Sequence, residues 1–170
     1  MSREQRCLLF DWGDTLMRVF PEYDGPMVTW PRVEAVPHAA EVLAAFQSQW
    51  LLALATNAEA STEADIRAAL ARVGLDRWLD KIYCFRGVGY KKSSPAFFAH
   101  VLADLGLEPR QVVMIGDDFE ADVLGANRCG IRALWLNVQS AEVRQGECYD
   151  TIHDLRALPS ALAELMGTTI

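Results

Sequence analysis

The sequence predicts an α/β fold with three layers, in which a central parallel β-sheet is covered by helices on both faces. Short apolar runs, bounded by polar or glycine residues, alternate along the chain with longer stretches of helical periodicity. Such alternation is typical of βαβ units, whose strands are parallel. Polar residues stand directly after several of the strand-like runs, at the edge where sheets of this kind bind ligands.

The predicted strands are short apolar segments that end at polar or turn-forming residues. They span 7–10, 51–55, 82–84, 112–115, 133–136 and 149–152. The nearly continuous apolar character of the first five is typical of strands that are buried on both faces.

Helices are predicted between these strands from apolar residues at helical spacing and from capping signals. Ser61 or Thr62 is the N-cap of one helix, and Ser94-Pro95 places a cap and a first-turn proline before another. The predicted helices span 39–46, 62–73, 97–105, 120–128 and 158–166. The stretch 18–37 is rich in proline and contains a turn signal at 23–26, so we interpret it as a hairpin or flap over the binding edge.

Length and composition predict one domain over residues 1–170, with 51% apolar and 23% charged residues. The formal net charge of −7 argues against a nucleic-acid partner, because phosphate backbones bind basic surfaces. The sequence has neither a long apolar run nor a secretory signal, so we expect a cytoplasmic protein without a membrane partner. The four cysteines lack paired spacing, and Cys7 and Cys84 fall in apolar runs, which predicts inert thiols.

Acidic residues gather after the first and fourth predicted strands, at Asp11, Asp14, Asp117, Asp118 and Asp122. Crowded carboxylates repel one another unless a cation neutralises them, and Mg²⁺ favours oxygen ligands. Thr56-Asn57 follows the second strand and offers an anion cradle, while Lys91 and Lys92 follow the third. An aspartate nucleophile, a divalent metal, a hydroxyl and a lysine suffice for phosphoryl transfer. Each feature alone is equally typical of turns, helix caps or solvated charge.

Together these residues resemble the four motifs of the haloacid dehalogenase superfamily. The segment 10–16, Phe-Asp-Trp-Gly-Asp-Thr-Leu, resembles the first motif, Thr56-Asn57 the second, 89–98 the third and 116–122 the fourth. They occur in the family's order between the first strand and Leu136. The resemblance implies a Rossmann-like fold, and the intervals between the motifs leave no room for the cap domain that many members insert.

The resemblance implies a set of metal-binding residues. Asp11 would be both the nucleophile and a direct ligand of Mg²⁺. The backbone carbonyl of Gly13 and the side chain of Asp117 would be the other protein ligands. Asp122 would hold metal-bound water, although Asp118 could do so instead.

The resemblance also implies a set of phosphate-binding residues. Thr56, Asn57 and Lys92 would bind the phosphoryl oxygens, and the lysine would in addition keep the nucleophile ionised. Counting back from Pro95 selects Lys92 rather than Lys91 as the lysine of the third motif.

The sequence departs from the phosphatase pattern two residues after the nucleophile, where a second aspartate usually acts as general acid and base. Gly13 occupies this position, and an aspartate follows one residue later at Asp14. Asp14 either takes over the acid/base role through a local shift or only stabilises the turn. Dehalogenases, phosphonate-cleaving enzymes and certain phosphatases of the superfamily also lack an acid at this position.

The leading hypothesis is a Mg²⁺-dependent phosphatase that hydrolyses phosphate monoesters through an aspartyl-phosphate on Asp11. One alternative is a dehalogenase or phosphonatase-type hydrolase, which Gly13 makes conceivable. The other is a catalytically weak regulatory protein that binds metal or phosphate. A site without a cap is open enough for a phosphorylated macromolecule as well as for a phosphorylated small molecule. Alternatively, another subunit of a homo-oligomer closes the site.

Overall fold

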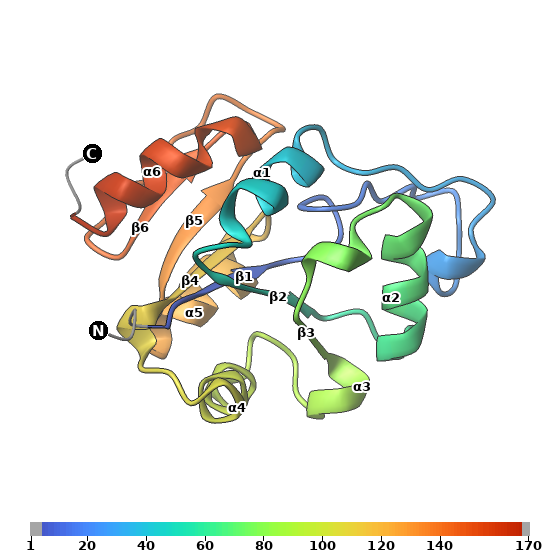
Figure 1. The fold of residues 1–170 in the computed structure, drawn as a ribbon, viewed down its shortest axis with the longest axis horizontal. Coiled ribbons are helices and arrows are strands. Elements are labelled where there is room, and N and C mark those ends of the chain that lie inside the picture. The colour runs from blue at the N-terminus through green and yellow to red at the C-terminus, as the bar shows by residue number, and fades with distance from the viewer. Residues whose placement is uncertain (1–4, 168–170) are drawn as a thin grey trace.

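The computed structural model describes residues 5–167 and contains a six-stranded sheet in the order β3-β2-β1-β4-β5-β6 (Figure 1). All neighbouring strands are parallel. The strands are β1 (Cys7–Phe10), β2 (Leu51–Thr56), β3 (Lys81–Cys84), β4 (Val112–Gly116), β5 (Arg132–Leu136) and β6 (Tyr149–Ile152). The chain order reverses between β1 and β4, so the topological switch point lies at the carboxyl ends of these two strands. The predicted fold class is confirmed.

Helices cover both faces of the sheet and complete the three layers (Figure 1). They are α1 (Ala39–Phe46), α2 (Glu63–Arg72), α3 (Phe85–Val88), α4 (Pro95–Leu105), α5 (Gly125–Arg128) and α6 (Leu158–Leu165). Buried residues of α1, α2 and α6 belong to the core on one face, and those of α4 and α5 to the core on the other. Two details differ from the prediction. The loop expected after β3 begins with the short helix α3, and the helix expected at 120–128 starts as a π-helical turn over Phe119–Leu124.

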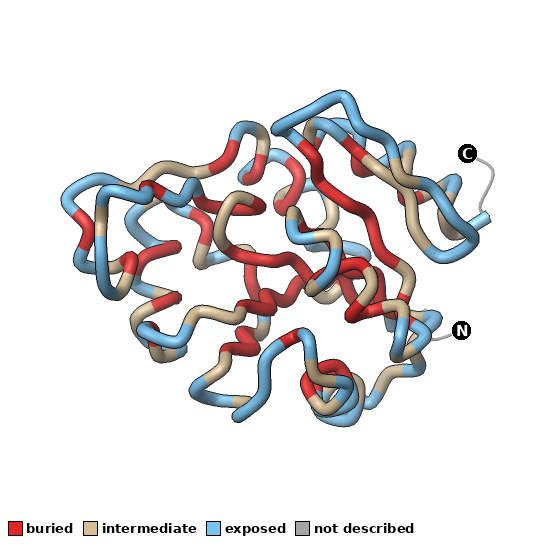
Figure 2. Tube along the Cα trace, turned by 180° about the vertical axis from the view of Figure 1, so that it is seen from behind, coloured by how far each residue is buried: buried red, intermediate tan, exposed pale blue. Residues whose placement is uncertain are grey.

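The two cores explain the continuous apolar character of the central strands. Along β1, Leu8 and Phe10 point into the core beneath α1, α2 and α6, whereas Cys7 and Leu9 point into the core beneath α4 and α5. All four side chains are fully buried, and the buried strands run through the middle of the molecule while loops form its exposed rim (Figure 2). Side chains alternate between the faces of a strand, so a strand covered on both faces is apolar throughout.

Two helices begin at the capping residues that the sequence indicates. Thr62, rather than Ser61, is the N-cap of α2 and forms a reciprocal capping box with Asp65. Ser94 is the N-cap of α4, where its hydroxyl accepts a hydrogen bond from the N–H of Ala96 and Pro95 occupies the first turn.

The stretch 18–37 packs closely on the domain and contains the short 3-10 turn Met27–Thr29. Four of its apolar side chains belong to the core that α1, α2 and α6 cover, namely Phe20, Met27, Trp30 and Val36. The guanidinium of Arg72 on α2 donates hydrogen bonds to the carbonyls of Val28 and Trp30, at 3.1 and 2.7 Å. These contacts hold the stretch as a wall beside the carboxyl ends of the strands.

The described residues contain no cap domain. The interval between β1 and β2 holds only the stretch 18–37 and α1, and the interval between β2 and β3 holds only α2 and a short turn. No helix among residues 5–167 has the length and hydropathy needed to cross a membrane.

The cysteine thiols differ in accessibility, which leads to a prediction about their reactivity. Cys7 is fully buried, and burial followed by the charge of Asp80 raises the pKa of its thiol to about 12, whereas Cys148 is exposed. The thiolate is the reactive form. We therefore expect iodoacetamide at pH 8 to modify Cys148 within minutes and Cys7 only after unfolding, as read by mass spectrometry of tryptic peptides. Rapid modification of Cys7 in the folded protein would contradict the packing of β1.

Candidate active site

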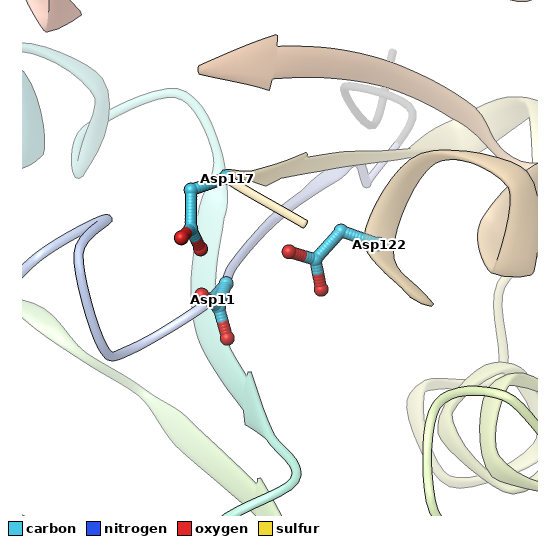
Figure 3. A group of neighbouring side chains, drawn as sticks. All are labelled: Asp11, Asp117 and Asp122. Carbon is cyan, nitrogen blue, oxygen red and sulfur yellow. The ribbon is translucent and has the colours of Figure 1, made fainter. Parts of the chain in front are cut away.

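Three carboxylates meet at the switch point of the sheet (Figure 3). Asp11 directly follows β1, Asp117 directly follows β4, and Asp122 lies in the π-helical turn. One carboxylate oxygen from each lies within 4.8 Å of the others. Asp11 and Asp122 are buried and Asp117 is partly buried, so their mutual repulsion is poorly screened by water.

Gly116 permits the close approach of Asp122 to the end of β4. A Cβ atom at Gly116 would lie only 2.1 Å from Oδ2 of Asp122, which no side chain can accommodate. With glycine in place, Oδ2 of Asp122 accepts a hydrogen bond from the N–H of Asp118 at 3.1 Å. The glycine at the end of β4 is therefore a requirement of the site.

Lys92 supplies the positive charge of the cluster. Its Nζ lies 2.6 Å from Oδ1 of Asp11 and 2.6 Å from Oδ1 of Asp122, and its side chain is only 3% exposed. Lys91 points elsewhere and forms an ion pair with Glu59 at the surface. The structure thus brings Lys92, and not Lys91, to the nucleophile candidate.

Asn57 holds the lysine loop in place. Its Oδ1 accepts a hydrogen bond from the backbone N–H of Lys92 at 2.7 Å, and the Nζ of Lys92 also donates to the carbonyl of Ala55 at 3.2 Å. Both contacts join the end of β2 to the loop after α3. The predicted phosphate contact of Asn57 stays a prediction, since the observed contact is a positioning one.

The charges of the cluster do not balance. Three carboxylates face one ammonium group, which leaves two negative charges in excess. Burial would lower the pKa of Lys92, but the ion pairs with Asp11 and Asp122 raise it above its usual value. Burial, followed by the hydrogen bond and charge of Asp11, raises the pKa of Asp117, and burial with the charge of Asp11 raises that of Asp122 despite Lys92. A cation bound among these carboxylates would stabilise their ionised forms.

Thr15 belongs to the site although the sequence argument gives it no role. Its hydroxyl is fully buried and lies 3.2 Å from Oδ2 of Asp11 and 3.3 Å from Oδ1 of Asp117. The hydroxyl carries one proton, so it donates to one of these carboxylates at a time. A signal was present in the sequence, because this threonine follows the nucleophile candidate by four residues, within the segment that resembles the first motif.

Gly13 and Asp14 form a tight turn above the carboxylates. Asp14 has the left-handed φ of 58°, and its Oδ1 accepts a hydrogen bond from the N–H of Val19 at 2.9 Å. A Cβ atom at Gly13 would lie 2.8 Å from Cγ2 of Val19. Asp14 therefore stabilises the turn, and the residue also lines the same pocket as Asp11. The metal contact of the Gly13 carbonyl stays a prediction.

The catalytic pocket has a volume of 250 Å³ and is lined by Asp11, Asp14, Thr56, Lys92, Asp117 and Asp122 among others. Thr56 is the last residue of β2, and its hydroxyl accepts a hydrogen bond from the N–H of Ala58 at 3.1 Å. Asp118 and Trp12, which neighbour Asp117 and Asp11 along the chain, have structural contacts. Asp118 accepts a hydrogen bond from the N–H of Ala121 at 2.9 Å as the cap of the π-helical turn. Trp12 is buried and packs with its Nε1 at 3.2 Å from the sulfur of Met17.

Comparison with known proteins identifies the class of this protein. The family model for haloacid dehalogenase-like hydrolases matches residues 13–130. Because this match covers more than half of the chain, the chain belongs to the haloacid dehalogenase-like hydrolase family.

Two curated relatives carry phosphatase names. The ribulose-1,5-bisphosphate 5-phosphatase of Halopiger xanaduensis is 34% identical over 100 residues, which cover 58% of this chain and 41% of that protein. The phosphoserine phosphatase of Thermus thermophilus is 32% identical over 107 residues, which cover 62% of this chain and 42% of that protein. The chain thus spans less than half the length of these two relatives.

Solved structures extend the similarity over nearly the whole chain. An uncharacterized protein from Listeria monocytogenes serotype 4b is 28% identical and superimposes with a TM-score of 0.82, which covers 95% of this chain and 99% of that one. A 2-haloacid dehalogenase from Pseudomonas syringae pv. Tomato DC3000 superimposes with a TM-score of 0.74, covers 95% of this chain and 99% of that one, and is 19% identical. The second similarity shows a shared fold alone.

Proposed function

We propose that this hydrolase is a Mg²⁺-dependent phosphatase that cleaves phosphate monoesters of small molecules through an aspartyl-phosphate on Asp11. The observation that carries the proposal is the cluster of Asp11, Asp117 and Asp122, two of whose carboxylates, Asp11 and Asp122, pair with the buried ammonium of Lys92. The phosphatase names of the curated relatives support the same reaction class. A hydroxyl for the transferring group, at Thr56, lines the same pocket.

The residues present fit a Mg²⁺ ion. The donors are oxygens, and their excess of two negative charges over the ammonium of Lys92 matches a divalent cation. Asp11, Asp117 and Asp122 would hold the ion, with the carbonyl of Gly13 as a further ligand. When bound, Mg²⁺ would polarise the phosphoryl group and offset the charge of the attacking carboxylate.

In the first step, a carboxylate oxygen of Asp11 forms a bond to phosphorus while the bond from phosphorus to the ester oxygen breaks. The ammonium of Lys92 and the hydroxyl of Thr56 hold the phosphoryl oxygens, on which negative charge is concentrated. The leaving oxygen takes up a proton, and Asp14 is the candidate donor because it is an acidic residue that lines the same pocket as Asp11.

In the second step, a water molecule attacks the phosphorus of the aspartyl-phosphate. The water gives its proton to the carboxylate that lost one in the first step, and the bond between phosphorus and Asp11 breaks. Inorganic phosphate leaves, and Asp11 returns to its ionised form beside Lys92.

Removal of the metal gives the test of this function. We expect purified protein to hydrolyse phenyl phosphate in the presence of Mg²⁺, to lose at least about a hundredfold in rate with excess chelator, and to recover when Mg²⁺ is restored. Asp117→Asn should weaken the response to Mg²⁺, since a ligand charge is lost, whereas Asp118→Asn should behave like wild type. Full turnover in excess chelator would contradict the proposal.

A dehalogenase is the second candidate, which the glycine at position 13 favours. The three clustered carboxylates argue for the phosphatase, because carbon–halogen cleavage has no phosphoryl charge for a metal to neutralise. Release of halide from a 2-haloacid, measured beside release of phosphate from phenyl phosphate, separates the two activities.

A further inference from the structure

A cavity with a volume of 490 Å³ adjoins the catalytic pocket. It lies at the carboxyl ends of β5 and β6, where 136–139 and 153–155 form one side, and the beginning and end of the stretch 18–37 form the other. This volume falls within the range of cavities that hold organic ligands. Asp14 and Val19 line both the cavity and the catalytic pocket, so the two spaces are adjacent.

The position of Asp14 indicates which part of a substrate enters this cavity. A general acid lies beside the oxygen that it protonates, which is the oxygen of the leaving group. Asp14 stands at the junction between the catalytic pocket and the cavity. A second hollow, of 220 Å³, also adjoins the catalytic pocket on the side of Trp12 and Trp30, but Asp14 does not line it. The leaving group therefore extends into the larger cavity.

The wall of the cavity is partly apolar. Val36, Leu136 and Leu155 are buried beneath it, and Val19 and Val138 are 42% and 51% exposed at its surface. These two are among the four large apolar residues that residues 5–167 leave exposed. Covering such surface with an apolar group of a ligand is favourable, since it removes that surface from water.

The charged side chains of the wall already have partners within the protein. Arg18 pairs with Glu34 at 3.0 Å, Asp154 pairs with Arg156 at 3.1 Å, and Oδ1 of Asp14 accepts the N–H of Val19. Nδ1 of His153 lies 2.7 Å from the carbonyl oxygen of Asn137, and a carbonyl oxygen only accepts, so Nδ1 carries a proton and donates it. The wall thus offers apolar contact, and its charged groups are already paired.

We infer that this cavity is the leaving-group site, and that it selects phosphate monoesters with an uncharged, ring-sized alcohol or phenol that has an apolar face. The inference rests on the proposed phosphatase function, because it assigns the part of the ester that departs from the phosphoryl group. Val138 lines the cavity but not the catalytic pocket. It is therefore the residue through which the apolar wall determines the specificity for the leaving group.

Two aryl esters of different size test the inference, since both leave as phenols. Wild-type protein is expected to give a higher kcat/KM with 2-naphthyl phosphate than with phenyl phosphate. Val138→Asn should reduce this preference about three- to tenfold, which corresponds to partial loss of one apolar side-chain contact. Val143→Asn is the matched control, because Val143 is 62% exposed and does not line the cavity. Both valines are exposed, so neither change should affect folding.

Binding of 2-naphthol, followed by its fluorescence, separates a failure of the inference from a failure of the phosphatase function. If neither ester is hydrolysed, the phosphatase function is wrong. Weaker naphthol binding by Val138→Asn than by Val143→Asn would still support the cavity as a ligand site. An unchanged preference in Val138→Asn, or naphthol binding that both variants share equally with wild type, would overturn the inference.

Discussion

Lys92→Ala is expected to lower kcat/KM for phenyl phosphate by on the order of a hundredfold or more, because it removes the positive charge aimed at the transferring phosphoryl group. The Nζ of Lys92 contacts Asp11 and Asp122 at 2.6 Å each and is nearly excluded from water. Its charge therefore acts at close range and with little screening. Steady-state kinetics at saturating Mg²⁺ measure the effect.

Lys91→Ala is the matched control for this prediction. Lys91 is 48% exposed and pairs with Glu59, and exposed ion pairs contribute about 0–1 kcal/mol. We expect its turnover to stay within about threefold of wild type, since the lost pair lies outside the catalytic pocket. The reverse ranking of the two variants would show that the other lysine serves the site.

Folding of the Lys92 variants needs its own measurement. Removal of one partner from a buried ion pair lowers the free energy of unfolding by about 3–5 kcal/mol, and here two carboxylates would be left facing each other. Lys92→Met keeps most of the volume without the charge, so it separates packing from electrostatics. Circular dichroism and thermal unfolding establish that the folded protein is assayed. A folded Lys92→Met protein with wild-type turnover would contradict the proposed role.

Asp14→Asn is expected to slow the hydrolysis of glycerol 2-phosphate by about a hundredfold or more, because an alkoxide leaving group needs a proton. Phenyl phosphate, with its better leaving group, should lose less in the first step and accumulate the phosphoenzyme. The phosphoenzyme, which is stable in acid and labile in alkali, is quantified by mass spectrometry after acid quenching. Its amount and the hydrolysis rates of the two esters measure both effects.

The local structure makes this substitution a clean one. Asn tolerates the left-handed backbone at least as readily as Asp, and its side-chain oxygen can still accept the N–H of Val19. The turn should therefore survive, so a loss of turnover reports chemistry. Asp118→Asn is the control, since Asp118 lines the same pocket but caps the π-helical turn. If Asp14→Asn hydrolyses glycerol 2-phosphate at the wild-type rate, Asp14 only stabilises the turn and has no acid/base role.

Short-range patterns were enough to predict the architecture. The apolar runs of β1 and β4 predict strands that are buried on both faces, and the caps at Thr62 and Ser94 predict where α2 and α4 begin. These features depend on residues that are neighbours along the chain, because strand alternation, helical periodicity and capping operate over a few residues. The positions of Asp11 and Asp117 follow from the same logic, since each directly succeeds a predicted strand.

By itself, then, the sequence determined the layered fold, the edge of the sheet that carries the site and the family to which the chain belongs. Only the tertiary structure decided that Asp122, and not Asp118, belongs to the carboxylate cluster, and that the hydroxyl of Thr15 contacts this cluster. The tertiary structure also packs 18–37 against α2, beside a cavity at the ends of β5 and β6. The physical reason is distance along the chain. Lys92 and Asp11 are 81 residues apart and still meet at 2.6 Å, because strand order, register and the missing side chain of Gly116 bring them and Asp122 together.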